Sequence, residues 1–378
     1  FRCFDRVLAF DAATGVCRCE AGITLGRLFE LAAPLGWYLP VQPGHPDLTV
    51  GGCLAADSHG KHPSREGTFR QQVLALTLFH PATGMVEVAP SQRGEVFDLT
   101  CGGYGLTGTI VTVTLQLRRA PAACEVTRVP VRDLTSTVEV LEEREGEAAL
   151  LYSWNDLSSR GGAFGRGFVC VGRAVDGAAD ANGAVRPYQR LPRAAAGPVP
   201  WWNRPSARLF NAVYSRAATA GGPQRQRLFD VLFPIGSKAA YFKLFGREGL
   251  HEYQALLPRE RFAEFATQVR KALTAAAVAP TLGSCKLFAG NASHLRFDGR
   301  GVALAIDLPR RHDTPRLLER LDGITADCGG IPNIIKDSRL PAAVVARCYP
   351  GYEEFRTRLR AHDSDRLYRS ELSQRLEL

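Results

Sequence analysis

Apolar and polar residues alternate in the first third of the chain in a way that predicts two hairpins and a long strand. The hairpins cover residues 7–22 and 72–90, where apolar residues recur at alternate positions on both sides of a turn. The strand covers residues 108–121 and is rich in β-branched side chains. Between the hairpins, Thr24 is positioned to cap a helix over residues 25–32.

The middle of the chain has a different pattern, in which helices and strands follow one another at regular intervals. Residues 127–131, 136–144 and 149–154 predict a strand, a helix and a strand. A strand, a helix, two strands and a helix are then predicted at residues 251–258, 259–276, 280–290, 301–309 and 314–330. This regularity predicts an open sheet with its helices on one side.

Two segments interrupt the regular pattern. Residues 172–205 are loaded with alanine, glycine, proline and arginine, which predicts a poorly structured, mobile excursion. Residues 331–340 predict a loop, and two charged helical segments follow it. We therefore expect an α+β fold whose divisions are residues 1–122, 123–330 and 331–378.

The composition fits a globular protein and excludes several other classes. The 378 residues are 45% hydrophobic and 22% charged, which supplies a large core and is unlike a disordered chain. No apolar run approaches the ~20 residues that span a bilayer, and the chain's start lacks the layout of a signal peptide. We expect a cytoplasmic protein, at most in peripheral contact with the inner face of a membrane. The net charge of +9 is scattered, which argues against nucleic acid as a partner.

The choice of basic and sulfur-containing residues raises more specific questions. Only six of the 47 basic residues are lysine, at positions 61, 238, 243, 271, 286 and 336. In such an arginine-rich background each lysine raises the question of a use for its primary amine. The ten cysteines include no CxxC pair, and the histidines lack the spacing of metal ligands, so no metal site is predicted.

Two glycine-rich segments give the strongest indication of chemistry. Residues 44–61 contain Gly51 and Gly52 just before a helix-like run over residues 53–57, and residues 101–108 contain four more glycines. Glycine lets a backbone approach a ligand and turn its N–H groups towards an anion. One glycine pair is more often a tight turn before a packed helix, but two such segments around one sheet predict a site for a large dinucleotide, with an anion at the start of the helix.

Seven motifs, in order, resemble the FAD-linked sugar oxidases of the vanillyl-alcohol oxidase fold, most closely the decaprenylphosphoryl-β-D-ribose 2′-oxidases. They are TVGGCLAADSHGK from position 49, GTF from 67, CGGYGLTGTI from 101, SWND from 153, EYQ from 252, CKLFAG from 285 and IIKDSRL from 334, and the ending RLEL is similar too. The resemblance spans essentially the whole chain. It implies an FAD-binding domain formed by the beginning and the end of the chain, with an α+β substrate domain inserted between them.

The resemblance also implies roles for individual residues. Lys336 would lie beside the flavin ring, and Lys61, Gln254 and Cys285 would surround the substrate, with Trp154 against the substrate or between the lobes. FAD contacts would come from Gly44, Thr49, Val50, Gly51, Gly52, Ala56, His59 and Ile110. The family's arginine-glycine phosphate loop would precede Phe1, and because the only methionine is Met85, we expect an N-terminal piece beyond the given sequence. Without that loop the FAD site would be incomplete and would hold FAD weakly.

Three departures from the family concern the substrate, and each site residue has a structural alternative. Asn333 replaces an aromatic residue, Glu252 replaces a glutamine, and Gly283 replaces an asparagine. An ion pair with Asp337 on an exposed turn is the alternative for Lys336. The other candidates would be ordinary surface or structural residues (His59, Lys61, Gln254) or core residues (Cys285, Trp154).

These observations predict an FAD-dependent oxidoreductase that takes hydride from a secondary carbinol of a sugar derivative, by resemblance the 2′-hydroxyl of a polyprenyl-phosphoryl pentose in cell wall arabinan biosynthesis. Lys336 would stabilise the reduced flavin, Gln254 and Lys61 would orient the sugar, and His59 would contact FAD or the substrate hydroxyl. A partner reductase would complete an epimerisation. The alternatives are an aldonolactone or alditol oxidase of the same fold and a non-catalytic relative without bound FAD.

Overall fold

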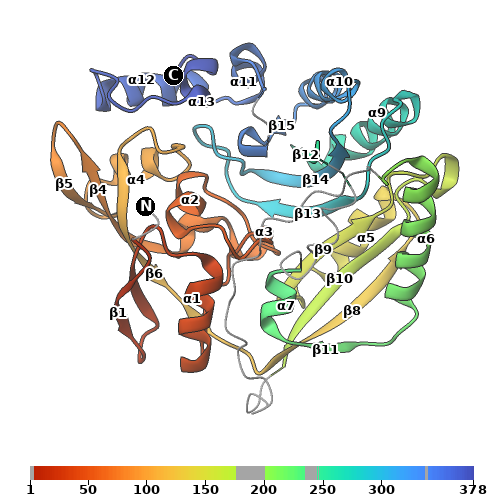
Figure 1. The fold of residues 1–378 in the computed structure, drawn as a ribbon, viewed down its shortest axis with the longest axis horizontal. Coiled ribbons are helices and arrows are strands. Elements are labelled where there is room, and N and C mark those ends of the chain that lie inside the picture. Colours follow the sequence, from red (N-terminus) through yellow and green to blue (C-terminus); the bar gives the residue numbers. More distant parts are fainter. Residues whose placement is uncertain (1–3, 176–200, 235–244, 246, 337–338) are drawn as a thin grey trace.

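The computed structural model describes residues 4–175, 201–234, 245, 247–336 and 339–378. They form a five-stranded sheet, an eight-stranded sheet and a two-stranded pair. The two larger sheets belong to two lobes, which Figure 1 shows side by side. The expected mixture of helices and strands is therefore confirmed.

The first lobe is built on an antiparallel sheet in the order β1-β2-β6-β4-β5, so both predicted hairpins and the long strand are confirmed. Its strands are Val7–Asp11 (β1), Val16–Glu20 (β2), Val73–His80 (β4), Gly84–Val88 (β5) and Thr109–Gln116 (β6). Strands Trp37–Tyr38 (β3) and Arg118–Arg119 (β7) form the separate pair. The helices are Leu25–Ala32 (α1), Val50–Ala55 (α2), Pro63–Glu66 (α3) and Gly94–Thr100 (α4).

Helix α1 shows why this lobe folds as its pattern predicts. Thr24 is its N-cap, and the Thr24 side chain accepts a hydrogen bond from the Arg27 N–H at 3.2 Å, which satisfies one of the free donors of the first turn. Leu25 and Leu28, on the same face of the helix, are buried in one core with Val113 of β6. The cap fixes where the helix begins, and its apolar face fixes which side packs on the sheet.

The second lobe is built on the larger sheet, whose order is β11-β8-β10-β9-β13-β14-β12-β15 and whose pairs are all antiparallel. Its strands are Ala123–Val131 (β8), Leu150–Asn155 (β9), Gly167–Val175 (β10), Gln224–Gln226 (β11), Leu250–Leu257 (β12), Gly283–Ala289 (β13), Arg300–Pro309 (β14) and Ile331–Pro332 (β15). The last strand lies inside the predicted loop at 331–340.

Helices cover both faces of this sheet, so the prediction of helices on one side is wrong. Leu134–Arg144 (α5), Phe262–Ala275 (α9) and Thr314–Asp327 (α10) share one core with the sheet. Arg204–Thr219 (α6) lies on the other face, where its Tyr214 ring is 5.1 Å from the ring of Trp154. Figure 1 shows α6 alongside β8 and β10. The short helix Leu228–Leu232 (α7) packs into the core of the first lobe.

The predicted excursion at residues 172–205 is wrong at both of its ends. Strand β10 continues to Val175, and α6 begins at Arg204, where Asn203 caps it by accepting from the Ser206 N–H at 3.0 Å. The central part of the predicted excursion, residues 176–200, lies outside the described residues. The high content of alanine and arginine suits a helix as well as an irregular segment, which is why composition alone gave the wrong boundary.

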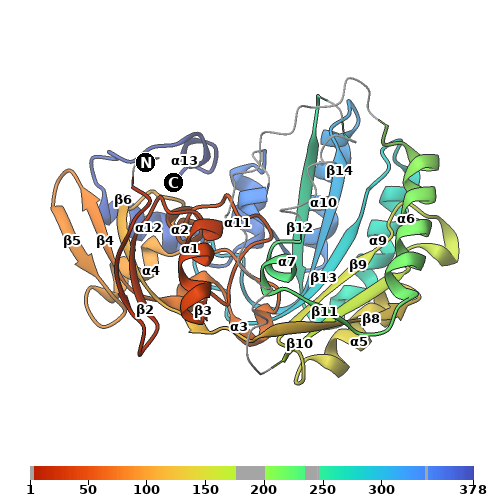
Figure 2. The same ribbon diagram turned by 60° about the horizontal axis from the view of Figure 1, so that its bottom comes forward.

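The end of the chain returns to the first lobe through Ala342–Cys348 (α11), Tyr352–His362 (α12) and Glu371–Arg375 (α13), three helices where the sequence predicts two. Both ribbon views place α12 and α13 beside the first sheet (Figures 1 and 2). The Tyr368 hydroxyl donates to the Phe79 carbonyl at 3.0 Å, and the His362 ring lies 2.8 Å from the Thr107 carbonyl. Segments far apart in sequence therefore form one structural unit.

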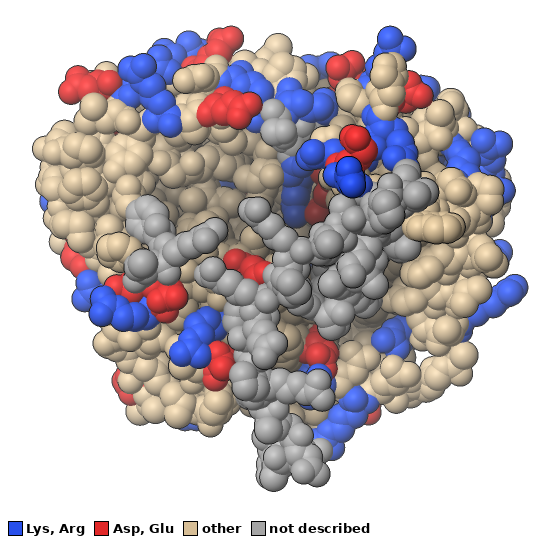
Figure 3. Space-filling view, in the orientation of Figure 1, with Lys and Arg blue, Asp and Glu red and all other residues tan. Residues whose placement is uncertain are grey.

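The surface carries charge of both signs. Figure 3 shows Lys and Arg interspersed with Asp and Glu on the face seen there, without a single basic block. Across the part of the chain that the structure describes, no helix is both long and apolar enough to cross a bilayer.

Candidate functional site

The first glycine segment forms helix α2, and its N–H groups are used differently from the prediction. The helix begins at Val50 rather than after the glycines, so Gly51 and Gly52 lie in its first turn. The Val50 N–H donates to the Ile23 carbonyl at 2.9 Å and the Gly51 N–H donates to Ala21 at 2.8 Å. Because backbone carbonyls already occupy these donors, the expected anion site at the start of the helix is not present in this form.

The glycines instead allow close packing around α2. A Cβ at Gly51 would lie 2.8 Å from the Cβ of Ala21, closer than side chains tolerate. The second glycine segment packs on the other end of the helix, where the Gly102 and Tyr104 N–H groups donate to the carbonyls of Leu54 and Ala55 at 3.1 and 2.8 Å. Gly102 and Tyr104 have φ of 77° and 55°, in the left-handed region. The two segments are thus neighbours, as the sequence suggests.

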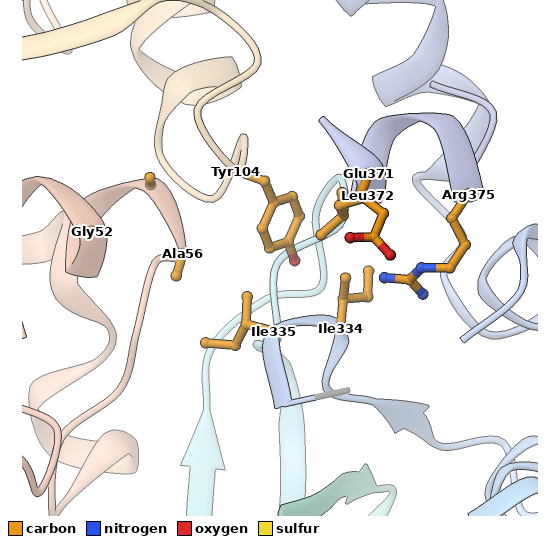
Figure 4. Close-up of a pocket in the computed structure, with 9 residues that line it drawn as sticks. Gly52, Ala56, Tyr104, Ile334, Ile335, Glu371, Leu372 and Arg375 are labelled. Carbon is orange, nitrogen blue, oxygen red and sulfur yellow. The ribbon is translucent and has the colours of Figure 1, made fainter. Parts of the chain in front are cut away.

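A cavity of about 400 Å³ opens beside these two segments. Figure 4 shows Gly52 and Ala56 on one side of it, Ile334 and Ile335 on another, and Tyr104 between them. Helix α13 closes the remaining side with Glu371, Leu372 and Arg375. The wall formed by α2 carries almost no side-chain bulk, because Ala55 also lies in it. The cavity is therefore apolar at α2 and at the two isoleucines, and α13 adds a carboxylate and a guanidinium to its lining.

The predicted cofactor residues fall into two groups in the structure. Gly52 and Ala56 line the cavity, and Lys336 directly follows the two isoleucines that line it. Five others do not line the cavity: Gly44 precedes α2, Thr49, Val50 and Gly51 lie at its start, and Ile110 lies in β6. His59 lies beside Gln254, where the lobes meet. Val50 and Ile110 are buried in the core of the first lobe, and Thr49 caps α2 through its side chain, which accepts from the Gly52 N–H at 3.2 Å.

The second group of candidate residues gathers where the two lobes meet. Strand β12 turns Glu252 and Gln254 to the same face, because alternate side chains share a face, and β13 turns Lys286 towards His59 of the first lobe. Gln254 Nε2 lies 2.9 Å from His59 Nε2. Lys286 Nζ lies 3.3 Å from His59 Nδ1 and donates to the Gly60 carbonyl at 2.9 Å. His59 is therefore the centre of a polar network between the lobes.

Lys336 and Lys61 belong to the same region but have different partners. Lys336 Nζ is 3.0 Å from a carboxylate oxygen of Glu252. Its alternative partner, Asp337, lies outside the described residues. Lys61 is only 7% exposed, and its ammonium lies 5.4 Å from the centre of the Tyr152 ring. Among the described residues, neither Lys61 nor Lys286 is part of an ion pair, whereas Lys336 is.

Burial sets the protonation of this network. Burial lowers the pKa of Lys61 to about 8, and burial together with Lys61 lowers the pKa of Lys286 well below its ordinary value. Burial and the Lys286 ammonium also lower the pKa of His59 well below its usual value. For Lys336, burial opposes the charged form, but Glu252 outweighs it and raises the lysine pKa. The site thus holds one fully paired cation and two amines that lack a counter-charge.

Lys286 is a site residue that the sequence interpretation missed, and Cys285 is not where it was expected. Cys285 is fully buried in the core under α5, α9 and α10, on the opposite face of β13 from Lys286. The period of two in a strand is the reason, since adjacent residues cannot face the same pocket. The scarcity of lysine was the signal that could have found Lys286. Trp154 lies on the same sheet face as Tyr152 but stacks on Phe168 beneath α6.

Two of the three departures from the family have structural explanations. Asn333 is 4% exposed, and its amide donates to Gln254 Oε1 at 2.7 Å, so a polar contact stands where the family has an aromatic ring. Gly283 lies on the helix-covered face of β13, and a Cβ there would come within 2.6 Å of Leu157. A side chain at position 283 therefore cannot reach the polar network.

No metal centre is indicated in the described part of the chain. There, no three His, Cys, Asp or Glu residues come together as ligands, and the nine described cysteines are free and buried. The thiols at positions 53 and 285 illustrate the consequence, because burial raises the pKa of each to about 12, which disfavours the thiolate that metals bind.

Comparison with known proteins identifies the cofactor domain and full-length relatives. The FAD binding domain family matches residues 1–89. An uncharacterised protein encoded in the mprA 5′ region of Streptomyces coelicolor is 34% identical over 376 residues, which cover 94% of this chain and 100% of that protein. The decaprenylphosphoryl-β-D-ribose oxidase of Mycolicibacterium smegmatis is 25% identical over 395 residues, covering 99% of this chain and 83% of the oxidase.

A more distant similarity is confined to one part of the chain. Human Delta(24)-sterol reductase is 27% identical over 128 residues, which are 34% of this chain and 25% of that enzyme. The family match adds FAD binding, and the relatives with named activities are an oxidase and a reductase, so the comparisons together indicate FAD-dependent redox chemistry. Because the Streptomyces protein is matched along its whole length at 34% identity, the chain belongs to the same family as that protein, and its FAD binding domain together with the relatives named as oxidases and dehydrogenases identifies it as an FAD-dependent oxidoreductase.

Proposed function

We propose that this protein oxidises a secondary alcohol of a sugar derivative that carries an anionic group, and that the substrate is a polyprenyl-phosphoryl pentose oxidised at its 2′-hydroxyl. The observation that carries the proposal is a pair of lysines between the lobes, the buried Lys61 and the half-buried Lys286, which form no ion pair with a carboxylate among the described residues. Two such amines are costly to bury unless an anion joins them. A phosphate supplies that anion.

The flavin ring of FAD fits the cavity beside α2. Its walls at Gly52, Ala55 and Ala56 have little bulk, and Ile334 and Ile335 supply an apolar surface opposite. When bound, FAD supplies the acceptor for the hydride that leaves the alcohol carbon. Lys336 follows Ile335 and stays protonated through Glu252, so it offers a fixed positive charge near the ring.

Replacing Ala56 by tryptophan is expected to prevent FAD binding without unfolding the protein. Ala56 is the C-cap of α2 and lines the cavity, so an indole there occupies the space of the flavin. Visible absorption of the purified protein measures bound FAD, and the matched control is Ala212→Trp on the exposed face of α6. Full FAD content in Ala56→Trp would place the flavin elsewhere.

The charged groups of the network are compatible with a bound phosphate, although the sequence places the acidic residue Glu252 among them. Glu252 taken alone would repel an anion, but its carboxylate is held by Lys336 at 3.0 Å. Lys61 and Lys286 have no such close partner, and burial disfavours their charged forms. A phosphate bound between them would favour the charged forms again, and the two ammonium groups would then act as point charges for its oxygens.

The chain's own groups can also take part in removing the two hydrogens of the alcohol. The C–H hydrogen leaves with its electron pair, while the O–H proton needs an acceptor as the carbonyl forms. His59 is neutral because burial and Lys286 lower its pKa, so its Nε2 can accept that proton. Gln254, 2.9 Å from Nε2, orients the hydroxyl at the same point. The ketone would pass to a partner reductase that completes an epimerisation, and the polyprenyl tail would bring the protein to a membrane surface.

The second candidate is an aldonolactone or alditol oxidase, which acts on a sugar without phosphate. Glu252 favours it, since a carboxylate is a good acceptor for several sugar hydroxyls. The test compares kcat/KM for a polyprenyl-phosphoryl pentose, the free pentose and the corresponding lactone at fixed salt. We expect the phosphoryl substrate to be the best by at least about 10-fold; a lactone as the best substrate would favour the second candidate.

The pH dependence provides an independent check of the anion site. Lys61 carries its charge below its pKa of about 8 and loses it above. The kcat/KM of the phosphoryl substrate should therefore fall as the pH rises above about 8, because kcat/KM reports the free enzyme. The free sugar should show no such fall. A parallel fall for both substrates would assign the titration to another group.

A further inference from the structure

A chain of hydrogen bonds runs from the backbone next to the cavity to the ring of His59. The Ile335 N–H donates to Asn333 Oδ1 at 3.3 Å, and Asn333 Nδ2 donates to Gln254 Oε1 at 2.7 Å. Gln254 Nε2 then meets His59 Nε2 at 2.9 Å, and His59 Nδ1 lies 3.2 Å from the carbonyl of Gly60. The chain begins at a group that can only donate, and at its other end His59 Nδ1 has two neighbours, the Gly60 carbonyl and, at 3.3 Å, Lys286 Nζ.

The donor at the start of the chain decides the direction of every bond as far as the histidine. A backbone N–H cannot accept, so the Asn333 oxygen faces Ile335 and its NH₂ group faces Gln254. The Gln254 oxygen therefore accepts, and its own NH₂ group points to the histidine. His59 Nε2 must then be the unprotonated nitrogen, and the ring proton lies on Nδ1, where the Gly60 carbonyl accepts it. Lys286 Nζ, 3.3 Å from Nδ1, directs its own hydrogen to the same carbonyl, to which it donates at 2.9 Å.

The pair at the centre of the chain is rigidly held. Besides its side-chain bond, the Asn333 N–H donates to the Gln254 backbone carbonyl at 2.8 Å. Asn333 and Gln254 are 4% and 3% exposed, so water cannot readily replace either bond. An amide in this position has one orientation that satisfies all its partners.

From this geometry we propose that Asn333 is a positioning residue, which holds His59 as the neutral tautomer with its proton on Nδ1 and its lone pair on Nε2. The role in catalysis rests on the proposed function, in which that lone pair accepts the substrate hydroxyl proton. The lone pair now accepts from Gln254, and a substrate hydroxyl would use the same one. Asn333 touches neither the hydroxyl nor the ring, and it acts through Gln254.

The charged groups that face His59 support the same protonation state. Lys286 approaches from β13 and Lys336 from the segment after β15. Burial is the largest cause of the lowered pKa of the imidazole, and both lysines lower it further. Lys61 follows in the same loop, and Glu252 on β12 is held by Lys336. On the remaining sides lie aromatic rings, of which Phe288 is 5.1 Å away. The Gly60 carbonyl and the Gln254 side chain act in the opposite direction, but burial and the two lysines outweigh them and keep the pKa of the imidazole well below its usual value.

The test is the position of the ring proton in Asn333→Asp. A carboxylate accepts and cannot donate, so the Gln254 amide must turn its NH₂ group to Asp and its oxygen to His59 Nε2, which then has to carry a proton. Nitrogen NMR of histidine-labelled protein distinguishes protonated from unprotonated ring nitrogens, with His59→Gln used for assignment. We expect the wild type to keep Nε2 unprotonated from pH 5 to pH 8 and Asn333→Asp to protonate it.

Controls make the result specific. Asn291→Asp introduces the same change on an exposed loop and should leave the His59 signals unchanged. Asn333→Leu removes the donor without adding charge, and both tautomers should then be populated. A wild-type ring protonated on Nε2, or an Nδ1 proton that stays in place in both Asn333 variants, would overturn the proposal.

Kinetics separates this proposal from the proposed function. With a substrate that reduces the flavin, Asn333→Asp should slow reduction about 100-fold, because a base with the wrong tautomer cannot accept the proton, while KM changes little. If the His59 ring proton moves in the Asn333 variants but the wild type oxidises no sugar, the positioning role of Asn333 stands and the proposed function is overturned. An unchanged reduction rate with a moved proton would overturn the catalytic use of the His59 lone pair.

Discussion

Replacing Lys336 by methionine is expected to slow flavin reduction by about 100-fold or more. The methionine keeps the length of the side chain but removes the positive charge that follows Ile335 of the cavity in which we propose the flavin ring, and a fixed charge beside a developing anion has an effect of this size. Stopped-flow absorbance under anaerobic conditions measures the rate directly. The same rate in both proteins would show that the Lys336 charge does not act on the flavin.

A second variant separates the charge of Lys336 from the effect of leaving Glu252 alone. The two groups are 3.0 Å apart, so Lys336→Met also leaves a carboxylate without its partner. Glu252→Gln keeps the lysine charge and removes its counter-charge, and it should raise the flavin midpoint potential, whereas Lys336→Met should lower it. The double variant Lys336→Met, Glu252→Gln should remain slow, because it lacks the cation and contains no unpaired carboxylate.

Removing the charges of Lys61 and Lys286 is expected to reduce kcat/KM for the phosphoryl substrate by about 100-fold for each lysine. A charge-assisted hydrogen bond contributes about 1.5–3 kcal/mol, and 1.4 kcal/mol corresponds to a factor of ten. Methionine again replaces each lysine at similar length. The free sugar should lose less than about threefold, because it has no phosphate to bind.

Lys271→Met is the matched control, since Lys271 is exposed on α9. It should leave kcat/KM unchanged for every substrate. If replacing Lys61 and Lys286 lowers kcat/KM equally for the phosphoryl substrate and the free sugar, the two lysines do not form a phosphate site. The aldonolactone or alditol oxidase is then the better interpretation. Thermal unfolding should accompany the kinetics, because each replacement also removes a buried amine that is costly in the free protein.

The local elements followed from the sequence because their causes are local. Thr24 caps α1 as predicted, and the alternation around β1, β2, β4 and β5 gave both hairpins. The prediction for the region around α6 was wrong because the cause of this helix is not local. Its buried residues form only a narrow stripe at Ala207 and Asn211. Such a weak pattern cannot be told from an irregular segment until the partner surface is known.

The candidate site shows the same division. Motif resemblance and the scarcity of lysine pointed to Lys61, His59, Gln254 and Lys336, and the structure gathers these four in one region. Cys285 was expected there as well, but strand alternation turns it into the core. Its neighbour Lys286 takes the place beside His59. A motif gives the position of a segment to within a residue, and in a strand one residue decides between pocket and core.

By itself, the sequence determined the cofactor class, the order of most elements and the residues capable of chemistry, because motifs, periodicity and residue type can each be read within short stretches of chain. Only the tertiary structure decided which polar groups meet. The Lys336–Glu252 pair joins residues 84 positions apart, and the His59–Gln254 contact spans 195. The charge on Lys61 and the tautomer of His59 depend on burial and on such distant neighbours, since a pKa is set by the surroundings of a group rather than by its place in the sequence.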